Sequence, residues 1–171
     1  MNKLLLGAAL AASMLAAAPA ANAAINVVLP PAAADGSITA EFGQSGIAFG
    51  AFNHTFNFTF PSAGTASTGV TSIKVSGKPS TNIDFTSVTL NGKAFAITNG
   101  VFDLATLDDW AVPAGVQTLV VQGTSGGNGS YTVDLAFAPV PEPATWAMMI
   151  IGFGAAGSMV RARRKLVPTV A

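Results

Sequence analysis

Residues 48–60 read Ala-Phe-Gly-Ala-Phe-Asn-His-Thr-Phe-Asn-Phe-Thr-Phe, and this stretch decides the fold. From Phe52 to Phe60 every second residue is aromatic or histidine, and the residues between them are Asn or Thr. Because successive side chains of a β-strand point to opposite faces, this alternation predicts a long strand with one buried aromatic face. Each fully buried Phe on that face would contribute about 1.5–3 kcal/mol.

Several other segments also carry strand signals, and no long amphipathic helix is expected before residue 140. The expected strands cover residues 70–75, 83–90, 93–98, 116–122 and 131–137. Asn91-Gly92 predicts a type I′ hairpin turn. Strands 116–122 and 131–137 are expected to pair across a flexible loop at 123–130, and residues 106–114 to form a turn or a single helical turn. The fold class expected is all-β, an antiparallel jelly-roll-like β-sandwich.

The composition limits how this sandwich can be held together and what it can bind. The chain has 171 residues, no cysteine and only 9% charged residues. Disulfides and thiolate metal sites are therefore excluded, and core packing must stabilise the domain alone. Residues 24–140 contain three lysines and seven acids, a net charge of 3 − 7 = −4. Nucleic acid is not expected as a partner, because phosphate binding needs clustered Lys and Arg.

The first 23 residues have the pattern of a secretory signal peptide. Lys3 precedes an apolar run over residues 4–18, and Ala21-Asn22-Ala23 offers small residues at a cleavage site after Ala23. The alternative is a retained anchor, but about 15 apolar residues fall short of the roughly 20 that span a bilayer. Export through the Sec translocon is expected, with residues 24–138 as the exported domain.

The C-terminal segment has the pattern of a membrane anchor. Residues 144–160 contain no charged side chain, and Arg161, Arg163, Arg164 and Lys165 follow them. A helix over 144–160 would be about 26 Å long, and Trp146 lies where an interfacial aromatic is expected. The sequence therefore predicts a transmembrane helix with a basic stop at 161–165 in the cytoplasm. A buried core helix is the alternative, but it would need a polar stripe.

The same segment resembles the PEP-CTERM sorting domain, in its PEPxxWA variant. The matching features are Pro141-Glu142-Pro143, Trp146-Ala147-Met148-Met149, Gly152-Phe153-Gly154 and the basic run, which places the signal at 139–165 and leaves 166–171 as a tail. The resemblance implies a Gram-negative host that makes exopolysaccharide and a membrane-embedded exosortase that removes the tail. Pro141, Glu142, Pro143 and Trp146 would be the sorting motif. The precursor would be anchored in the inner membrane, and the product would be a cell-surface or extracellular protein.

The exported domain also resembles the FxDxF family of PEP-CTERM proteins. The signature falls on Phe52-Asn53-His54-Thr55-Phe56, where His54 takes the place of the acid. Residues 84–92 and the loop before Tyr131 share the resemblance. It implies a location and a fold, and no enzymatic activity.

Few residues outside the tail suggest chemistry. His54 is the only histidine, and a lone histidine on an aromatic face indicates a structural role. Asp103, Asp108 and Asp109 are weak candidates for a calcium site, although the loop pattern of known calcium sites is missing. Trp110 could stack on a sugar ring or form part of the core.

These features predict a non-enzymatic protein without a cofactor. Its role would be structural or one of interaction with other molecules, in an exopolysaccharide matrix or biofilm. The alternatives are a carbohydrate-binding module of that matrix and, less favoured, an extracellular hydrolase, for which no paired acid and base is found.

Overall fold

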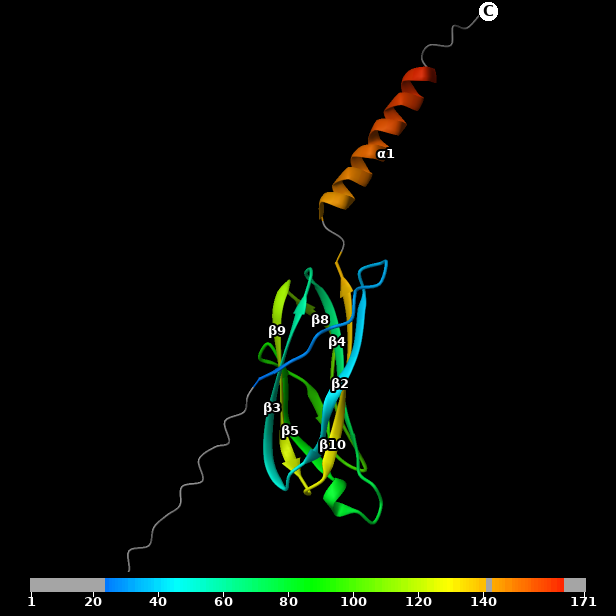
Figure 1. Ribbon diagram of the computed structural model, residues 1–171. Helices are drawn as coiled ribbons and strands as arrows, with labels where there is room; N and C mark the ends of the chain where they lie inside the picture. Colours follow the sequence, from blue (N-terminus) through cyan, green and yellow to red (C-terminus); the bar gives the residue numbers. More distant parts are fainter. Residues whose placement is uncertain (1–23, 141–142, 165–171) are drawn as a thin grey trace, which may run out of the picture.

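Two β-sheets face each other in the computed structural model, which describes residues 24–140 and 143–164 (Figure 1). The strands are β1 (Ile25–Asn26), β2 (Ile38–Ile47), β3 (Gly50–Phe60), β4 (Gly64–Ile73), β5 (Ile83–Leu90), β6 (Lys93–Ala94), β7 (Ala96–Thr98), β8 (Phe102–Val112), β9 (Gly115–Ser125) and β10 (Gly129–Pro139). A 3₁₀ turn, η1 (Pro79–Thr81), lies between β4 and β5, and one helix, α1 (Pro143–Arg164), follows β10. The all-β sandwich predicted from the sequence is confirmed.

The chain crosses repeatedly between the two sheets. The first sheet has the order β1-β3-β9-β5-β6, and the second sheet has the order β2-β10-β4-β8-β7. Consecutive strands such as β2 and β3, or β9 and β10, therefore lie in different sheets, as in a jelly roll. All pairings are antiparallel except that of β1 with β3, which is parallel over two residues.

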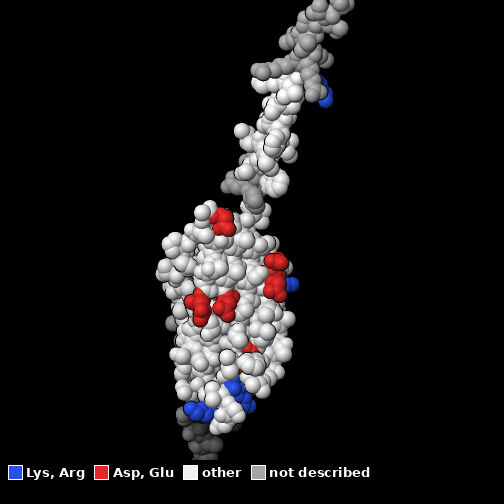
Figure 2. All heavy atoms as spheres, turned by 90° about the vertical axis from the view of Figure 1, so that its right-hand side faces the viewer, with Lys and Arg blue, Asp and Glu red and all other residues white. Residues whose placement is uncertain are grey.

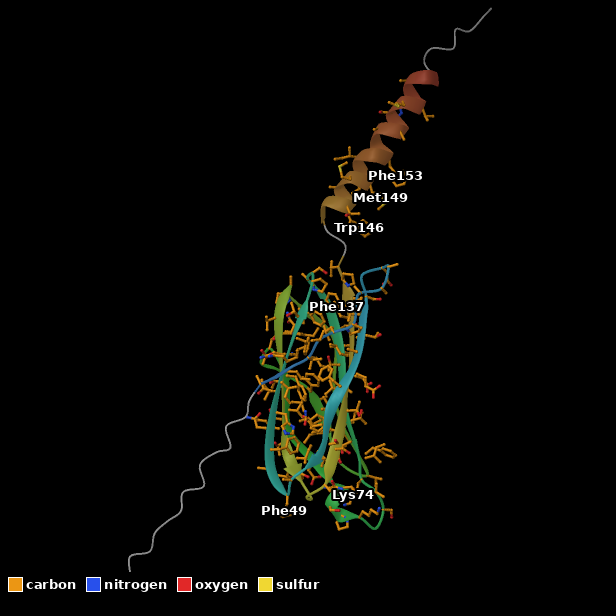
Figure 3. The ribbon with its side chains drawn as sticks, viewed as in Figure 1. Phe49, Lys74, Phe137, Trp146, Met149 and Phe153 are labelled. Atoms are coloured by element: carbon orange, nitrogen blue, oxygen red, sulfur yellow. The ribbon has the colours of Figure 1, made fainter. Side chains whose placement is uncertain are left out.

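The core lies between the sheets and is built on the aromatic face of β3. Phe56, Phe58 and Phe60 are buried, as the alternation predicted. They meet the inward residues of β10: the rings of Phe60 and Phe137 stack at 4.2 Å between centroids, and Phe56 meets Tyr131 edge-on at 6.4 Å. Figure 3 shows side chains filling the space between the sheets, with Phe137 near the end where β10 finishes.

Strand β5 has the predicted bounds, but its side chains do not follow one alternation. Ile83 and Phe85 are buried, and so are Val88 and Leu90. A bulge in β5 between Phe85 and Ser87, where its register with β9 shifts by one residue, accounts for the switch, because a bulge exchanges the two faces of a strand. The bulge lets both halves of β5 face the core, which a strict period of two would forbid.

The hairpin after β5 is confirmed. Asn91 and Gly92 have φ of 49° and 81°, the pair of positive values that a type I′ turn needs. The hairpin is short, however, because β6 pairs with β5 over two residues only. The chain then crosses at the buried Phe95 to enter the second sheet as β7.

Two expectations for the second half of the chain are wrong. Strands β9 and β10 do not pair with each other: β9 lies between β3 and β5, and β10 lies between β2 and β4. Much of the expected loop at 123–130 belongs to these strands, which leaves a connection of three residues. Residues 106–114 do not form a turn either, because β8 runs on to Val112.

Strand β8 is kinked where the sequence suggested a turn. Ser67 of β4 faces both Asp108 and Asp109, and Asp109 has a φ of 47°. The backbone N–H of Asp109 donates to Ser67 Oγ at 3.0 Å, which satisfies the amide at the bulge. Adjacent aspartates and the following Pro113 thus marked a bulge and a strand end, not a helix.

Two glycines with open surroundings provide a test of the turn geometry. An added Cβ would meet no atom within 4 Å at Gly92 or at Gly69, but only Gly92 has a positive φ. We predict that Gly92→Ala lowers the free energy of unfolding by about 1–2 kcal/mol, because left-handed backbone is strained for alanine. Gly69→Ala, in a regular strand, should leave stability unchanged or slightly raised.

Urea unfolding of the two variants measures this difference. Equal losses at both positions would contradict the type I′ assignment.

Candidate functional site

The C-terminal segment forms a helix that does not belong to the core. Strand β10 ends at Pro139, and α1 begins at Pro143, a residue whose fixed φ suits the first helical position. Every side chain described along α1, from Thr145 to Ala162, is exposed. The exposed apolar ones are Trp146, Met148, Met149, Ile150, Ile151, Phe153, Met159 and Val160. The sandwich therefore leaves the apolar surface of α1 uncovered.

The prediction of a transmembrane helix over residues 144–160 needs correction. A helix is present there, but no helix in the part of the chain that the structure describes is long and apolar enough to cross a membrane. The uncharged run has 17 residues, below the roughly 20 required. The hydropathy of this run is lowered further by Ser158 and by three glycines, Gly152, Gly154 and Gly157.

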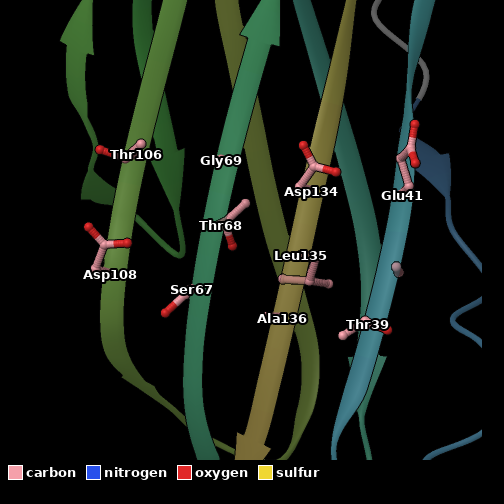
Figure 4. A pocket seen from close by; sticks show the side chains of 11 residues that line it. Thr39, Glu41, Ser67, Thr68, Gly69, Thr106, Asp108, Asp134, Leu135 and Ala136 are labelled. Carbon is pink, nitrogen blue, oxygen red and sulfur yellow. The ribbon is translucent and has the colours of Figure 1, made fainter.

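A groove of about 610 Å³ lies on the outer face of the second sheet, across β2, β10, β4 and β8. Figure 4 shows Glu41, Asp134 and Asp108 along it. Asp134 pairs with Glu41 on β2 and with Gly69 on β4. Gly69 supplies no side chain, so the middle of the floor is open. We call this feature, with Ser67 and Thr106 on its β4 and β8 sides, the acidic groove.

The charge of the acidic groove is of one sign. Its lining contains three carboxylates and no Lys, Arg or His. Asp134 and Glu41 are opposite each other on neighbouring strands, an arrangement that destabilises a sheet because the charges repel. The surface is thus suited to a cationic or hydroxyl-rich ligand.

The acidic groove was not predicted from the sequence. Strand β2 was not predicted, because Gly43 and Gly46 interrupt the alternation of its side chains. Glu41 was therefore not assigned to any strand or face. Asp134 could have been assigned to an outer face, since Val133 and Leu135 beside it are apolar. Its cross-strand neighbours depend on pairings over long sequence distances, which no local pattern contains.

His54 has the structural role that the sequence indicated. Its Nδ1 is 2.8 Å from Tyr131 Oη, in an aromatic cluster with Phe52 stacked at 5.1 Å. Burial lowers the pKa of His54 and raises the pKa of Tyr131. Both groups are therefore neutral at pH 7, and the hydrogen bond joins an uncharged imidazole to an uncharged phenol.

The three candidate calcium ligands do not meet. Asp103 pairs in register with Ser72, whereas Asp109 bonds to Ser67. Five residues of β4 separate these partners, roughly 17 Å at about 3.4 Å per residue. Asp108 lines the acidic groove. Among the described residues no three or more His, Asp or Glu side chains form a group that could hold a metal ion.

Asp103 is an unusual buried acid. Its exposed fraction is 0%; the Gly100 N–H donates to Oδ1 at 2.8 Å, and Oδ2 has no hydrogen-bond partner among the described residues. Burial raises the pKa of Asp103, the Asp84 charge raises it further, and the Gly100 hydrogen bond opposes the rise. The negative charge is therefore unfavourable for the folded state.

Trp110 is less available to a ligand than the sequence suggested. Its exposed fraction is 37%, and Lys93 Nζ lies 4.6 Å from the ring centroid. This is a cation–π contact, which covers one face of the ring. The stacking surface for a sugar is reduced accordingly.

One serine has the sequence context of a nucleophile but not its geometry. Residues 123–127 read Gly-Thr-Ser-Gly-Gly, which fits the G-x-S-x-G pattern. Ser125 is buried, and its Oγ donates to the Ile47 carbonyl at 2.8 Å. The chain continues into β10 and not into a helix. The hydroxyl therefore fixes the turn between β9 and β10.

Comparison with protein families identifies the C-terminal segment. Residues 139–165 match the family described as the PEP-CTERM protein-sorting motif. This chain carries a PEP-CTERM sorting signal. The motif implies an exported protein that an exosortase sorts and processes from a membrane-anchored precursor. The PEPxxWA variant and the FxDxF family remain predictions.

The residues predicted for sorting are placed only in part. Trp146 and Arg161 are exposed on α1, and Pro143 begins it. Arg163 and Arg164 fall in its last turn. Pro141, Glu142 and Lys165 lie outside the described residues, as does the predicted signal peptide with Ala21 and Ala23.

Two solved structures resemble the sandwich weakly. A pre-peptidase C-terminal domain of a collagenase from Bacillus anthracis aligns with a TM-score of 0.40 and 15% identity, over 67% of this chain and 95% of that one. The catalytic domain of a GH87 α-1,3-glucanase in complex with nigerose aligns with a TM-score of 0.30 and 16% identity, over 63% of this chain and 22% of that one. A comparison with curated proteins gave no match.

The buried carboxyl of Asp103 gives a pH-dependent prediction. The pKa of Asp103 in the folded state lies above the unfolded value of 3.8. Below pH 3.8 the carboxyl is protonated in both states, and the free energy of unfolding then falls as the pH rises through the folded pKa. We predict that Asp103→Asn raises the free energy of unfolding at pH 7 by an amount on the order of 1 kcal/mol. The gain should disappear below pH 3.8.

Urea unfolding at several pH values measures this effect, with the exposed Asp108→Asn as control. A loss of stability at pH 7 would show that the ionised form of Asp103 supports the fold.

Proposed function

We propose that this chain is the precursor of a surface or extracellular-matrix protein of a Gram-negative bacterium, with a non-enzymatic role. The observation that carries the proposal is the PEP-CTERM motif at 139–165. The division of the chain supports it, because the core residues lie between Ile38 and Phe137 and none of the side chains described along α1, from Thr145 to Ala162, is among them. Removal of the tail would therefore leave the sandwich with its whole core.

We propose further that the sandwich acts by binding and not by catalysis. His54 is engaged with Tyr131, and Ser125 is buried in a turn. Asp103, whose pKa is raised by burial, faces the interior and not the acidic groove. These placements leave hydrolysis as the less favoured alternative.

A carbohydrate-binding module is the second candidate, because the acidic groove combines carboxylates with hydroxyl groups of Ser67 and Thr106. Such groups can accept and donate hydrogen bonds to sugar hydroxyls. The acidic groove supports this candidate better than Trp110, which Lys93 covers. Loss of polysaccharide binding in Asp134→Asn but not in Trp110→Ala would favour it over a purely structural role.

The sorting proposal is tested by the intact mass of the protein recovered from its host. We predict a mass that lacks residues 1–23 and also the residues beyond the Pro141–Pro143 region. The same host without its exosortase should retain the tail, and so should Glu142→Ala in the complete host. The exposed Asp134→Asn is the control, which should be processed normally.

A mass that ends at Ala171 in the complete host would contradict the proposal. The product would then be an unprocessed protein, and the surface destination would be wrong.

A further inference from the structure

The lysines among residues 24–140 all lie outside the lining of the acidic groove. Of the three lysines of residues 24–140, Lys93 contacts the Trp110 ring, and the other two are Lys74 and Lys78. Figure 2 shows basic side chains at one end of the sandwich and acidic side chains over the face above them. This is the outer face of the second sheet, which holds the acidic groove. The outer face of the second sheet is therefore acidic, whereas the end of the sandwich carries two exposed lysines, of which Lys74 lies near the carboxyl of the buried Asp103, which also interacts with Asp84.

The basic end also exposes apolar side chains. Val101, Phe102 and Ile73 are 65%, 63% and 58% exposed, and Val75 is exposed as well. Ile73 and Phe102 are register partners on β4 and β8. We call these four residues together with Lys74 and Lys78 the tip. Exposed apolar residues that cluster in this way commonly mark an interaction surface.

The tip is ordered before it meets a partner. The Lys74 N–H donates to the Val101 carbonyl at 3.1 Å, and the Val75 N–H donates to Thr81 Oγ1 at 2.9 Å. Thr81 Oγ1 in turn donates to the Lys78 carbonyl at 2.8 Å. Because these bonds fix the backbone around both lysines, less conformational entropy is lost on binding.

The acidic groove complements the two lysines of the tip in charge. It offers three carboxylates without a cation, and two of them repel each other across β10 and β2. Ammonium groups placed there would relieve this repulsion. The missing side chain at Gly69 leaves room for a bulky partner side chain.

We propose that the tip of one molecule docks into the acidic groove of a second copy of this chain. Tip and groove are different surfaces, so the contact is head-to-side and each molecule keeps one free tip and one free groove. Such heterologous contacts produce open chains of molecules when the rotation does not close a ring. The tip lies at the end of the sandwich opposite to the end of β10, where the sorting segment begins (Figures 1 and 3).

Sedimentation velocity tests the contact on the full chain and on residues 24–140. The shorter chain keeps all the buried core residues of the sandwich, because these lie between Ile38 and Phe137. We expect association that grows with protein concentration and weakens at high salt, because salt screens exposed charges. A groove variant, Glu41→Gln with Asp108→Asn and Asp134→Asn, should weaken association about tenfold or more. A tip variant, Lys74→Glu with Lys78→Glu, should do the same.

Mixing the two variants distinguishes this geometry from any other. The tip variant keeps an intact groove, and the groove variant keeps an intact tip. Their mixture should therefore form dimers that contain one molecule of each variant. No chain of more than two molecules should form. Gly69→Trp should block association by filling the groove, and Gly69→Ala is its control.

Several results would overturn the proposal. One is a wild-type chain that stays monomeric while its groove binds a soluble amino-sugar polymer such as chitosan. Another is a tip that binds vesicles of phosphatidylglycerol without self-association. A mixture of variants that remains monomeric would also exclude the head-to-side contact.

The inference deepens the interaction role proposed above and rests on it. Sorting is tested by the intact mass of the protein, which shows whether the tail is present. Self-association is tested by sedimentation velocity, which depends on the sandwich. Either can therefore fail without the other.

Discussion

Packing of β3 against β10 is the interaction on which the rest of the structure depends. The chain contains no cysteine, so no disulfide can join the two sheets. The stacked rings of Phe60 and Phe137 and the edge contact of Phe56 with Tyr131 connect them instead. These contacts turn alternate residues of β10 inward, which leaves Asp134 on the outer face. The same strand then ends at Pro139, where the sorting segment begins. One strand thus sets the core, the acidic groove and the exit of the tail.

Local patterns predicted what depends on residues near each other in the chain. The aromatic alternation of residues 48–60 predicted β3, and Asn91-Gly92 predicted the turn after β5, because φ and side-chain direction follow from neighbouring residues. The sorting motif was also visible, since its recognition depends on a short contiguous stretch. The calcium candidates were grouped because they are close in sequence, yet β8 is extended and separates Asp103 from Asp109.

The remaining features depend on contacts between distant segments. Strands β9 and β10 look like a hairpin in the sequence, but crossing between sheets buries both of their apolar faces. The bulge in β5 turns Val88 inward, and its position depends on the pairing of β5 with β9 and not on the sequence of β5 alone. The acidic groove joins Glu41, Asp134 and Asp108 from three strands. No local pattern contains such pairings, because a β-sandwich whose chain crosses between its sheets is assembled mainly from contacts between distant residues.

Function is divided along the chain. The sorting signal occupies residues 139–165 and overlaps the sandwich only at Pro139, the last residue of β10. The sandwich's own features are a basic, apolar tip and an acidic groove, which suit it to binding. A stable core independent of the tail is the condition for this division, because the proposed processing would remove the helix.

Native-state hydrogen exchange tests this independence most directly. Amide protection would be compared between the full chain and the same chain ended at Val140. The account predicts that β3 and β10 exchange most slowly, with equal protection in both chains. Loss of protection in these strands when the tail is removed would show that α1 stabilises the fold, and would contradict a sandwich held together by its own aromatic core.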